Sequence, residues 1–219
     1  MSPGPTPRAV IFDLGGVLLR NGRPSDVARR YPDADPEVVT RALMGVYGDD
    51  DDHPWHRLER GEISMREYQQ AVRQRLLDAG ITPAPTQRPP GESGSPFQFE
   101  PNEQMITLVR QLRSAGYRTG MLTNNVRELR SAWWPVSEWP RLFDDIVDSH
   151  EVGMRKPNLA IYTLSAARLG VDPLHSVFLD DVITNVAAAE RAGMTGVHVE
   201  GDGTGAIRQV RELVRLPQD

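Results

Sequence analysis

One aspartate stands between an apolar run and two glycines in the segment AVIFDLGGVLL, residues 9–19. A carboxylate that a strand delivers into a glycine turn is placed to attack phosphorus, which divides one hard displacement into two steps. The leaving oxygen also needs a proton, and position 15, where an acid would supply it, is a glycine. Asp13 is therefore the predicted nucleophile, and the source of that proton is an open question.

Three later segments, MLTNN, GMRKPN and VFLDD, also place polar residues at or just after apolar runs. In a doubly wound sheet, ligands bind at the carboxyl ends of the strands, so we expect these residues to meet Asp13 in one crevice. They are Thr123, Asn124 and Asn125, then Lys156, and then Asp180 and Asp181, with Asn185 where the next helix begins.

Each of these residue types suits a phosphate monoester as ligand. Mg2+ prefers oxygen ligands and keeps several waters, which fits two carboxylates, a carbonyl and a phosphate oxygen. Thr123 and the N–H groups that start the next helix can hold phosphate oxygens, and Glu128 is spaced to form a capping box with Asn125. Lys156 adds a fixed positive charge against the charge of the transferring group.

The elements that must position these residues alternate between strands and helices. Apolar, β-rich runs separated by segments of helical spacing predict an α/β fold with a doubly wound parallel sheet. Gly116, Gly170 and Gly193 each follow an amphipathic run and suit the left-handed residue that ends a helix. The predicted strands are Ala9–Phe12, Arg118–Leu122, Ile146–Val147, Ser176–Leu179 and Gly196–Val199.

The first strand is separated from a helix that starts near Pro101 by far more residues than a βα loop contains. We interpret residues 20–96 as an inserted α-helical cap, and residues 1–19 and 97–219 as the core. Residues 81–96 are rich in proline, glycine and serine, which predicts a linker that returns the chain to the core.

Two helix starts are readable within the insertion. Asp35 before Pro36 suits an N-cap followed by proline at the first helical position. Ser64 and Glu67 have the spacing of a capping box, on a helix that we expect to run to about Asp78.

Composition excludes several classes of function. The net charge of -5 and the pI near 5.6 argue against broad contact with nucleic acid. Without cysteine, neither disulfides nor thiolate metal sites can form. The sequence has no apolar stretch that would cross a membrane and no signal peptide, so a cytoplasmic protein is expected. We interpret the acidic run 48–52 as a solvated loop or helix start rather than a metal site.

The four strand-end segments, in this order, resemble the motifs of the haloacid dehalogenase superfamily, and the resemblance covers nearly the whole chain. It implies a Rossmann-like core with an inserted cap, and an aspartate nucleophile that works with Mg2+. The implied roles are nucleophile for Asp13, phosphate binding for Thr123, Asn124 and Lys156, metal binding for Asp13, Asp181 and the backbone carbonyl of Gly15, and support for Asp180 and Asn185.

Three further segments, WHRLERGEIS, WWPVSEWP and EVGMRKPNLAIY, are similar to one branch of that superfamily. This branch contains bacterial α-D-glucose-1-phosphate phosphatases and the N-terminal phosphatase domain of soluble epoxide hydrolase, and the bacterial group also reads D-L-G in the first motif. The resemblance implies a phosphatase for a small phosphate ester. We expect a monomer or a homodimer. A good leaving group needs less help from an acid, so we expect sugar 1-phosphates, acyl phosphates or aryl phosphates.

Two other functions stay open. Dehalogenases of the same superfamily use the equivalent aspartate on carbon without a metal, although Asp181 and Thr123 favour phosphate chemistry. Gly15 is also compatible with a catalytically inactive binding or regulatory protein. The retained nucleophile, lysine and carboxylates favour an enzyme over this alternative.

Histidines and tryptophans of the insertion are candidates for contact with substrate. His53 and His56 are alternative sources of the missing proton, although loop histidines near an acidic run are usually exposed. Trp55 is the tryptophan best placed to contact a substrate. We expect the remaining residues of these types to be structural or to lie in the core: Trp133, Trp134, Trp139, His150, His175 and His198.

Overall fold

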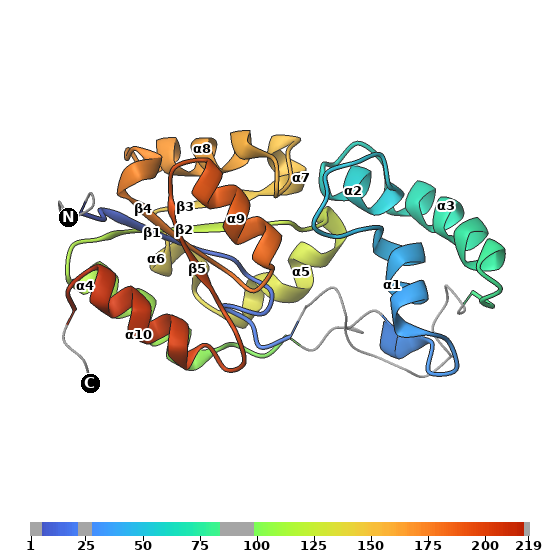
Figure 1. Cartoon of the computed structure of the whole chain (residues 1–219), viewed down its shortest axis with the longest axis horizontal. Coiled ribbons are helices and arrows are strands. Elements are labelled where there is room, and N and C mark those ends of the chain that lie inside the picture. Colours follow the sequence, from blue (N-terminus) through green and yellow to red (C-terminus); the bar gives the residue numbers. More distant parts are fainter. Residues whose placement is uncertain (1–5, 22–27, 84–98, 217–219) are drawn as a thin grey trace.

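A five-stranded parallel sheet lies at the centre of the computed structural model, which describes residues 6–21, 28–83 and 99–216 (Figure 1). The strand order is β3-β2-β1-β4-β5. The α/β prediction is confirmed, and each predicted strand lies within one residue of its observed bounds. These are β1 Ala9–Phe12, β2 Arg118–Thr123, β3 Asp145–Asp148, β4 Ser176–Asp180 and β5 Thr195–His198.

Strand β1 lies in the middle of the sheet and pairs with β2 on one side and β4 on the other. Its side chains alternate between two apolar clusters, with Val10 and Phe12 in one and Ala9 and Ile11 in the other. This alternation is the period of two of a strand whose two faces are both covered. Because β1 is the point where strand order reverses, the residue that follows it emerges in the crevice where such sheets bind ligands.

Helices cover both faces of the sheet (Figure 1). Three of them end at Gly116, Gly170 and Gly193, whose φ angles of 86°, 70° and 96° confirm the predicted left-handed residues. One face carries α4 Glu103–Ser114 and α10 Thr204–Leu213, and the other carries α8 Leu159–Arg168 and α9 Ile183–Arg191. No helix of the described ranges is both long and apolar enough to cross a membrane.

Short helices between β2 and β4 complete the core. Trp133 and Trp139 are fully buried there, and the Trp139 indole N–H donates to the Trp133 carbonyl oxygen at 3.2 Å. Trp134 packs edge-on against Trp133, which confirms a structural place for all three. The short elements are η2 Arg127–Leu129, α5 Arg130–Trp133, η3 Trp134–Val136, α6 Trp139–Leu142, α7 Ser149–Val152 and η4 Pro173–His175.

Residues 28–83 form a helical insertion with its own small apolar core. Its helices are α1 Pro36–Met44, α2 Pro54–Glu59 and α3 Met65–Asp78, and they lie beyond the end of the sheet towards which β1 runs (Figure 1). The predicted starts are confirmed, since Asp35 caps α1 and Ser64 and Glu67 form both bonds of a capping box on α3.

The insertion is joined to the core by two adjacent segments. Leu19 and Pro101 form an antiparallel bridge, the Arg20 N–H donates to the Glu100 carbonyl oxygen at 2.8 Å, and the Asn102 N–H donates to the Leu18 carbonyl oxygen at 2.8 Å. The chain therefore leaves and re-enters the core at one place. Within the predicted linker, residues 84–96 lie outside the described residues, and the predicted domain bounds stay a prediction.

Candidate active site

Asp13 is the first residue after β1, and its position is set by the sheet. Its backbone N–H donates to the Leu179 carbonyl oxygen of β4 at 2.9 Å, so the chain keeps the pairing of the strand up to this residue. The side chain is buried, with 7 % of the residue exposed. The predicted nucleophile thus lies at the carboxyl edge of the sheet, where the strand order reverses.

Lys156 forms two ion pairs at this edge. Its Nζ lies 2.7 Å from Oδ1 of Asp13 and 2.7 Å from Oδ2 of Asp180. All three side chains are at least nine-tenths buried, so each charge depends on its partners rather than on water. The structure therefore brings Lys156, from the loop after α7, together with aspartates at the ends of β1 and β4, while their catalytic roles stay predictions.

Asn124 holds the backbone of Lys156. Its side-chain Oδ1 accepts from the Lys156 N–H at 2.8 Å, and its Nδ2 donates to the Lys156 carbonyl oxygen at 3.0 Å. The Asn124 side chain, predicted to bind phosphate, thus uses both of its polar atoms to bind the backbone of Lys156. Its backbone N–H is the group that we expect to bind phosphate. Thr123, one residue earlier, is 2 % exposed at the end of β2.

Asp180 is fully buried and bound from several sides. Besides Lys156, it accepts from Nδ2 of Asn185 at 3.0 Å and from the Val182 N–H at 2.8 Å. These bonds fix the turn between β4 and α9, because both donors belong to the residues that start the helix. The supporting role predicted for Asp180 and Asn185 fits this arrangement.

Asp181 points towards the glycine turn that follows Asp13. Gly16 has a φ of 72°, and a Cβ there would collide with the carboxylate of Asp181. Nε2 of His198 lies 3.1 Å from the Asp181 carbonyl oxygen. Glycine at position 16 therefore serves two purposes, since it allows the left-handed turn and leaves room for the carboxylate.

The carboxylates of Asp13, Asp180 and Asp181 form a group that can hold a cation. Each offers an oxygen atom, and these atoms lie within 4.8 Å of one another. Burial raises the pKa of Asp13 to about 8, Lys156 opposes this rise, and the charges of Asp180 and Asp181 add to it. A donor set made only of oxygen, in which anions repel one another, fits Mg2+.

The predicted capping box at Asn125 and Glu128 is wrong. The first helical turn after β2 begins at Arg127, and no side chain caps it. Oδ1 of Asn125 instead accepts from the neighbouring Val126 N–H at 2.8 Å, while the Asn125 backbone N–H donates to Oγ of Ser149 at 2.9 Å. Ser149 thus ties Asn125 to the segment after β3, and the helical turn begins two residues later.

Histidines of the insertion are buried rather than exposed, so that part of the prediction is wrong. His53 caps α2 by accepting from the Trp55 N–H at 3.2 Å, and Nδ1 of His56 lies 2.7 Å from a carboxylate oxygen of Asp51. Trp55 is partly buried and packs edge-on against Tyr68 within the insertion. These contacts give all three a place in the fold of the insertion, and their contact with a substrate stays a prediction.

Sequence reasoning missed Arg155, Glu59 and Tyr47. Arg155 and Glu59 form a fully buried ion pair between core and insertion, with Nε and Oε2 2.8 Å apart. Tyr47 directly precedes the acidic run 48–52. Burial and the charge of Glu59 raise the pKa of its hydroxyl, as do the charges of Asp13 and Asp180. The only sequence signal was the arginine beside Lys156 in GMRKPN.

Comparisons with known proteins agree with this geometry. A sesquiterpene phosphatase of Aspergillus oryzae is 30 % identical over 94 % of this chain and 96 % of its own length. The bifunctional epoxide hydrolase 2 of Sus scrofa is 28 % identical over 94 % of the chain, which spans 38 % of that larger protein. A haloacid dehalogenase family enzyme of Bacteroides thetaiotaomicron, crystallised with magnesium and inorganic phosphate, shares the fold with a TM-score of 0.57 and 19 % identity, over 89 % of this chain and 94 % of that one.

The family itself is shown by a sequence model. The model of the haloacid dehalogenase-like hydrolases matches residues 7–193, a span that includes every residue predicted to act as nucleophile, bind phosphate or bind the metal. With this match and a relative that is 30 % identical over 94 % of its length, the chain belongs to the haloacid dehalogenase-like hydrolases.

Proposed function

We propose that this protein is a Mg2+-dependent phosphatase that hydrolyses a small phosphorylated metabolite through an aspartyl-phosphate on Asp13. The observation that carries the proposal is the buried group at the carboxyl edge of the sheet, where Lys156 lies 2.7 Å from the Asp13 carboxylate and Asp180 and Asp181 lie beside it. The relative from Aspergillus oryzae, which is named a phosphatase, supports the same reaction class.

The residues divide the reaction into two displacements. One carboxylate oxygen of Asp13 attacks phosphorus, the bond from phosphorus to the ester oxygen breaks, and that oxygen leaves with the bonding electrons as an anion. An alkoxide or phenolate is then neutralised by taking a proton from solvent water. Water then attacks the acyl phosphate, which releases inorganic phosphate and restores the Asp13 carboxylate. Lys156 keeps a positive charge beside the attacking oxygen, and Thr123 with the Asn124 N–H holds phosphate oxygens.

The metal would be held by the residues around the turn after β1. Asp13, Asp181 and the backbone carbonyl of Gly15 would supply its protein ligands. When bound, Mg2+ supplies positive charge between an anionic nucleophile and a phosphate dianion. Asp180 keeps Lys156 in place through its own ion pair.

Gly15 bears on the choice of substrate. Gly16 has a positive φ, whereas Gly15 is not among the described glycines with this conformation, so the backbone at position 15 does not require glycine. We propose that substrates with a good leaving group need no acid at this position. Sugar 1-phosphates, acyl phosphates and aryl phosphates are such substrates.

The test is phosphate release from a panel of aryl, sugar 1-, sugar 6- and sesquiterpene phosphates, with Mg2+ and with EDTA. Wild type is compared with Asp13→Asn, and Asp33→Asn on the exposed surface of the insertion is the control. We expect turnover that needs Mg2+, is lost in Asp13→Asn and is kept in Asp33→Asn. Equal efficiency on glucose 1-phosphate and glucose 6-phosphate would contradict the leaving-group proposal.

Two outcomes would overturn the proposed reaction. Chloride release from a 2-haloacid without Mg2+, in place of phosphate release, would identify a dehalogenase. No turnover of any ester by a folded protein that binds Mg2+ would identify a binding protein.

A further inference from the structure

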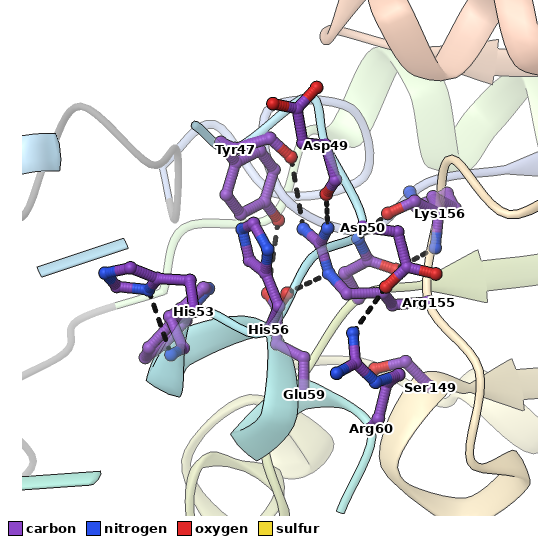
Figure 2. Close-up of polar contacts among 12 residues, drawn as sticks. Tyr47, Asp49, Asp50, His53, His56, Glu59, Arg60, Ser149, Arg155 and Lys156 are labelled. Carbon is purple, nitrogen blue, oxygen red and sulfur yellow. Dashed lines mark hydrogen bonds and ion pairs between the residues drawn. The ribbon is translucent and has the colours of Figure 1, made fainter. Parts of the chain in front are cut away.

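A buried arginine of the core reaches into the helical insertion. Arg155 has no exposed side-chain surface, and its Nε donates to Oε2 of Glu59 at 2.8 Å. The other two nitrogens of the guanidinium donate to backbone carbonyl oxygens, Nη2 to Tyr47 at 3.1 Å and Nη1 to Asp49 (Figure 2). All three nitrogens of the guanidinium are therefore bound by the insertion.

Burial of the charges of Arg155 and Glu59 costs free energy unless each charge is hydrogen-bonded to a partner. Glu59 is as deeply buried as Arg155, and burial raises the pKa of its carboxyl while Arg155 opposes the rise. Two buried charges that have lost water are stable only when each satisfies the other, and removal of one leaves the other uncompensated. The pair therefore favours the arrangement in which the insertion lies against the core.

Neighbouring contacts show how closely the two parts are packed. A Cβ at Gly61 would lie 2.7 Å from the His150 carbonyl oxygen, and one at Gly48 would lie 2.5 Å from Oγ1 of Thr184. Thr184 belongs to the first turn of α9, directly after Asp181 and Val182. The loop that carries Tyr47 and Gly48 thus lies beside the turn that holds the carboxylates.

Arg155 is linked to Lys156 through the backbone of the core and to Tyr47 through contacts with the insertion. Lys156 follows it directly in the chain, so a shift of Arg155 is transmitted to the lysine that contacts Asp13. Tyr47 is fixed by three contacts, since its carbonyl oxygen accepts from Arg155, its ring lies 5.3 Å from the guanidinium, and its hydroxyl donates to Oε1 of Glu59 at 3.4 Å.

We propose that Arg155 and Glu59 are positioning residues, which hold Lys156 against Asp13 and Tyr47 beside the reaction site when the insertion is closed. Neither residue has to touch the substrate. The proposal rests on the proposed function, because it assigns closure of the insertion as a condition for attack by Asp13.

The experiment compares Arg155→Lys, Glu59→Gln and the double variant in the full chain with Mg2+ and para-nitrophenyl phosphate. Lysine keeps the charge, but its single nitrogen cannot reach the three acceptors that the three nitrogens of the planar guanidinium contact. We expect kcat/KM to fall roughly 100-fold in each single variant, the size expected when a buried pair loses a partner, and no further in the double variant. Glu62→Gln is the matched control, since Glu62 pairs with Arg57 and Arg60 on the exposed surface of the insertion.

Hydrogen exchange separates positioning from loss of stability and from failure of the proposed function. We expect faster exchange at residues 45–62 and 154–158 in both single variants, with the apolar strands protected as in wild type. Additive losses in the double variant, or unchanged exchange in both segments, would overturn the proposal. If wild type releases no phosphate, the proposed function fails, whereas faster exchange in both segments would still support the positioning role.

Discussion

Two buried cations that are neighbours in the chain serve different regions of the molecule. Lys156 turns into the core, where carboxylates from the ends of β1 and β4 hold it. Arg155 turns to the insertion, where one carboxylate and two backbone carbonyls hold it. The core site therefore depends on the identity of its side chains, whereas two of the three partners of Arg155 depend only on the path of the backbone.

The largest expected effect tests the core half of this comparison. Lys156→Met removes the cation that forms an ion pair with Asp13 and leaves a side chain of similar length. We expect kcat to fall about 1,000-fold, as when a donor to a developing charge is lost. Exchange at residues 45–62 should stay at the wild-type rate, and a faster rate there would show that the two cations act as one unit.

Gly16→Ala tests whether the turn after Asp13 is shaped for the metal. An alanine at this left-handed position costs about 1–2 kcal/mol, and its Cβ would also displace the Asp181 carboxylate. We expect Mg2+ affinity, measured by calorimetry, to fall about 10- to 100-fold. Gly170→Ala is the matched control, because its φ is 70° and nothing lies within 4 Å of the added Cβ. Equal loss of affinity in both variants would refute the role of Asp181.

Mg2+ binding should depend on pH through the core carboxylates. Because the pKa of Asp13 is raised to about 8, a proton competes with Mg2+ for this carboxyl near and below that pH. Apparent affinity should therefore rise with pH, by at most about tenfold per unit, and level off above about pH 8. Calorimetry in two buffers of different ionisation enthalpy measures the released protons. Binding without proton release would contradict this prediction.

The smallest effect concerns the insertion alone. Burial, Arg75 and His56 lower the pKa of His53 to about 4, so between about pH 6.5 and 4 the unfolded chain takes up a proton that the folded chain does not. This histidine therefore lowers stability as pH falls. His53→Asn keeps a cap acceptor and removes the titration, so its stability should fall by about 2 kcal/mol less than that of wild type between about pH 7 and pH 5.

Thermal unfolding followed by circular dichroism at these two pH values measures this difference. His175→Asn makes the same side-chain change in the core and should behave as wild type. Turnover of His53→Asn should match wild type at neutral pH. A large loss of turnover would instead support His53 as the missing acid.

Sequence alone predicted residues whose place follows from a strand end. Asp13, Asp180 and Asp181 follow buried runs of known direction, so the parallel sheet brings them to one edge. Sequence could not predict the pair of Arg155 and Glu59, because 96 residues separate its members and each is ordinary in its own segment.

The errors share a physical cause. Asn125 has the spacing of a capping residue, but Ser149 from another segment competes for its backbone. His53 lies next to an acidic run, yet the Gly45 turn leaves room for its ring and buries it. Local sequence patterns predict which residues can cap a helix or lie at the surface. Contacts with distant segments decide whether a given residue does so.

The bridge between Leu19 and Pro101 bears on how such enzymes diversify. The two ends of the insertion are hydrogen-bonded to each other where they meet the core. The sheet is therefore in contact with the same two paired segments, whatever residues lie between them. A different insertion can be exchanged there in evolution, or grafted in the laboratory, without a change in the path of any strand. The group of carboxylates and Lys156 at the edge of the sheet can thus stay the same while the insertion above it changes.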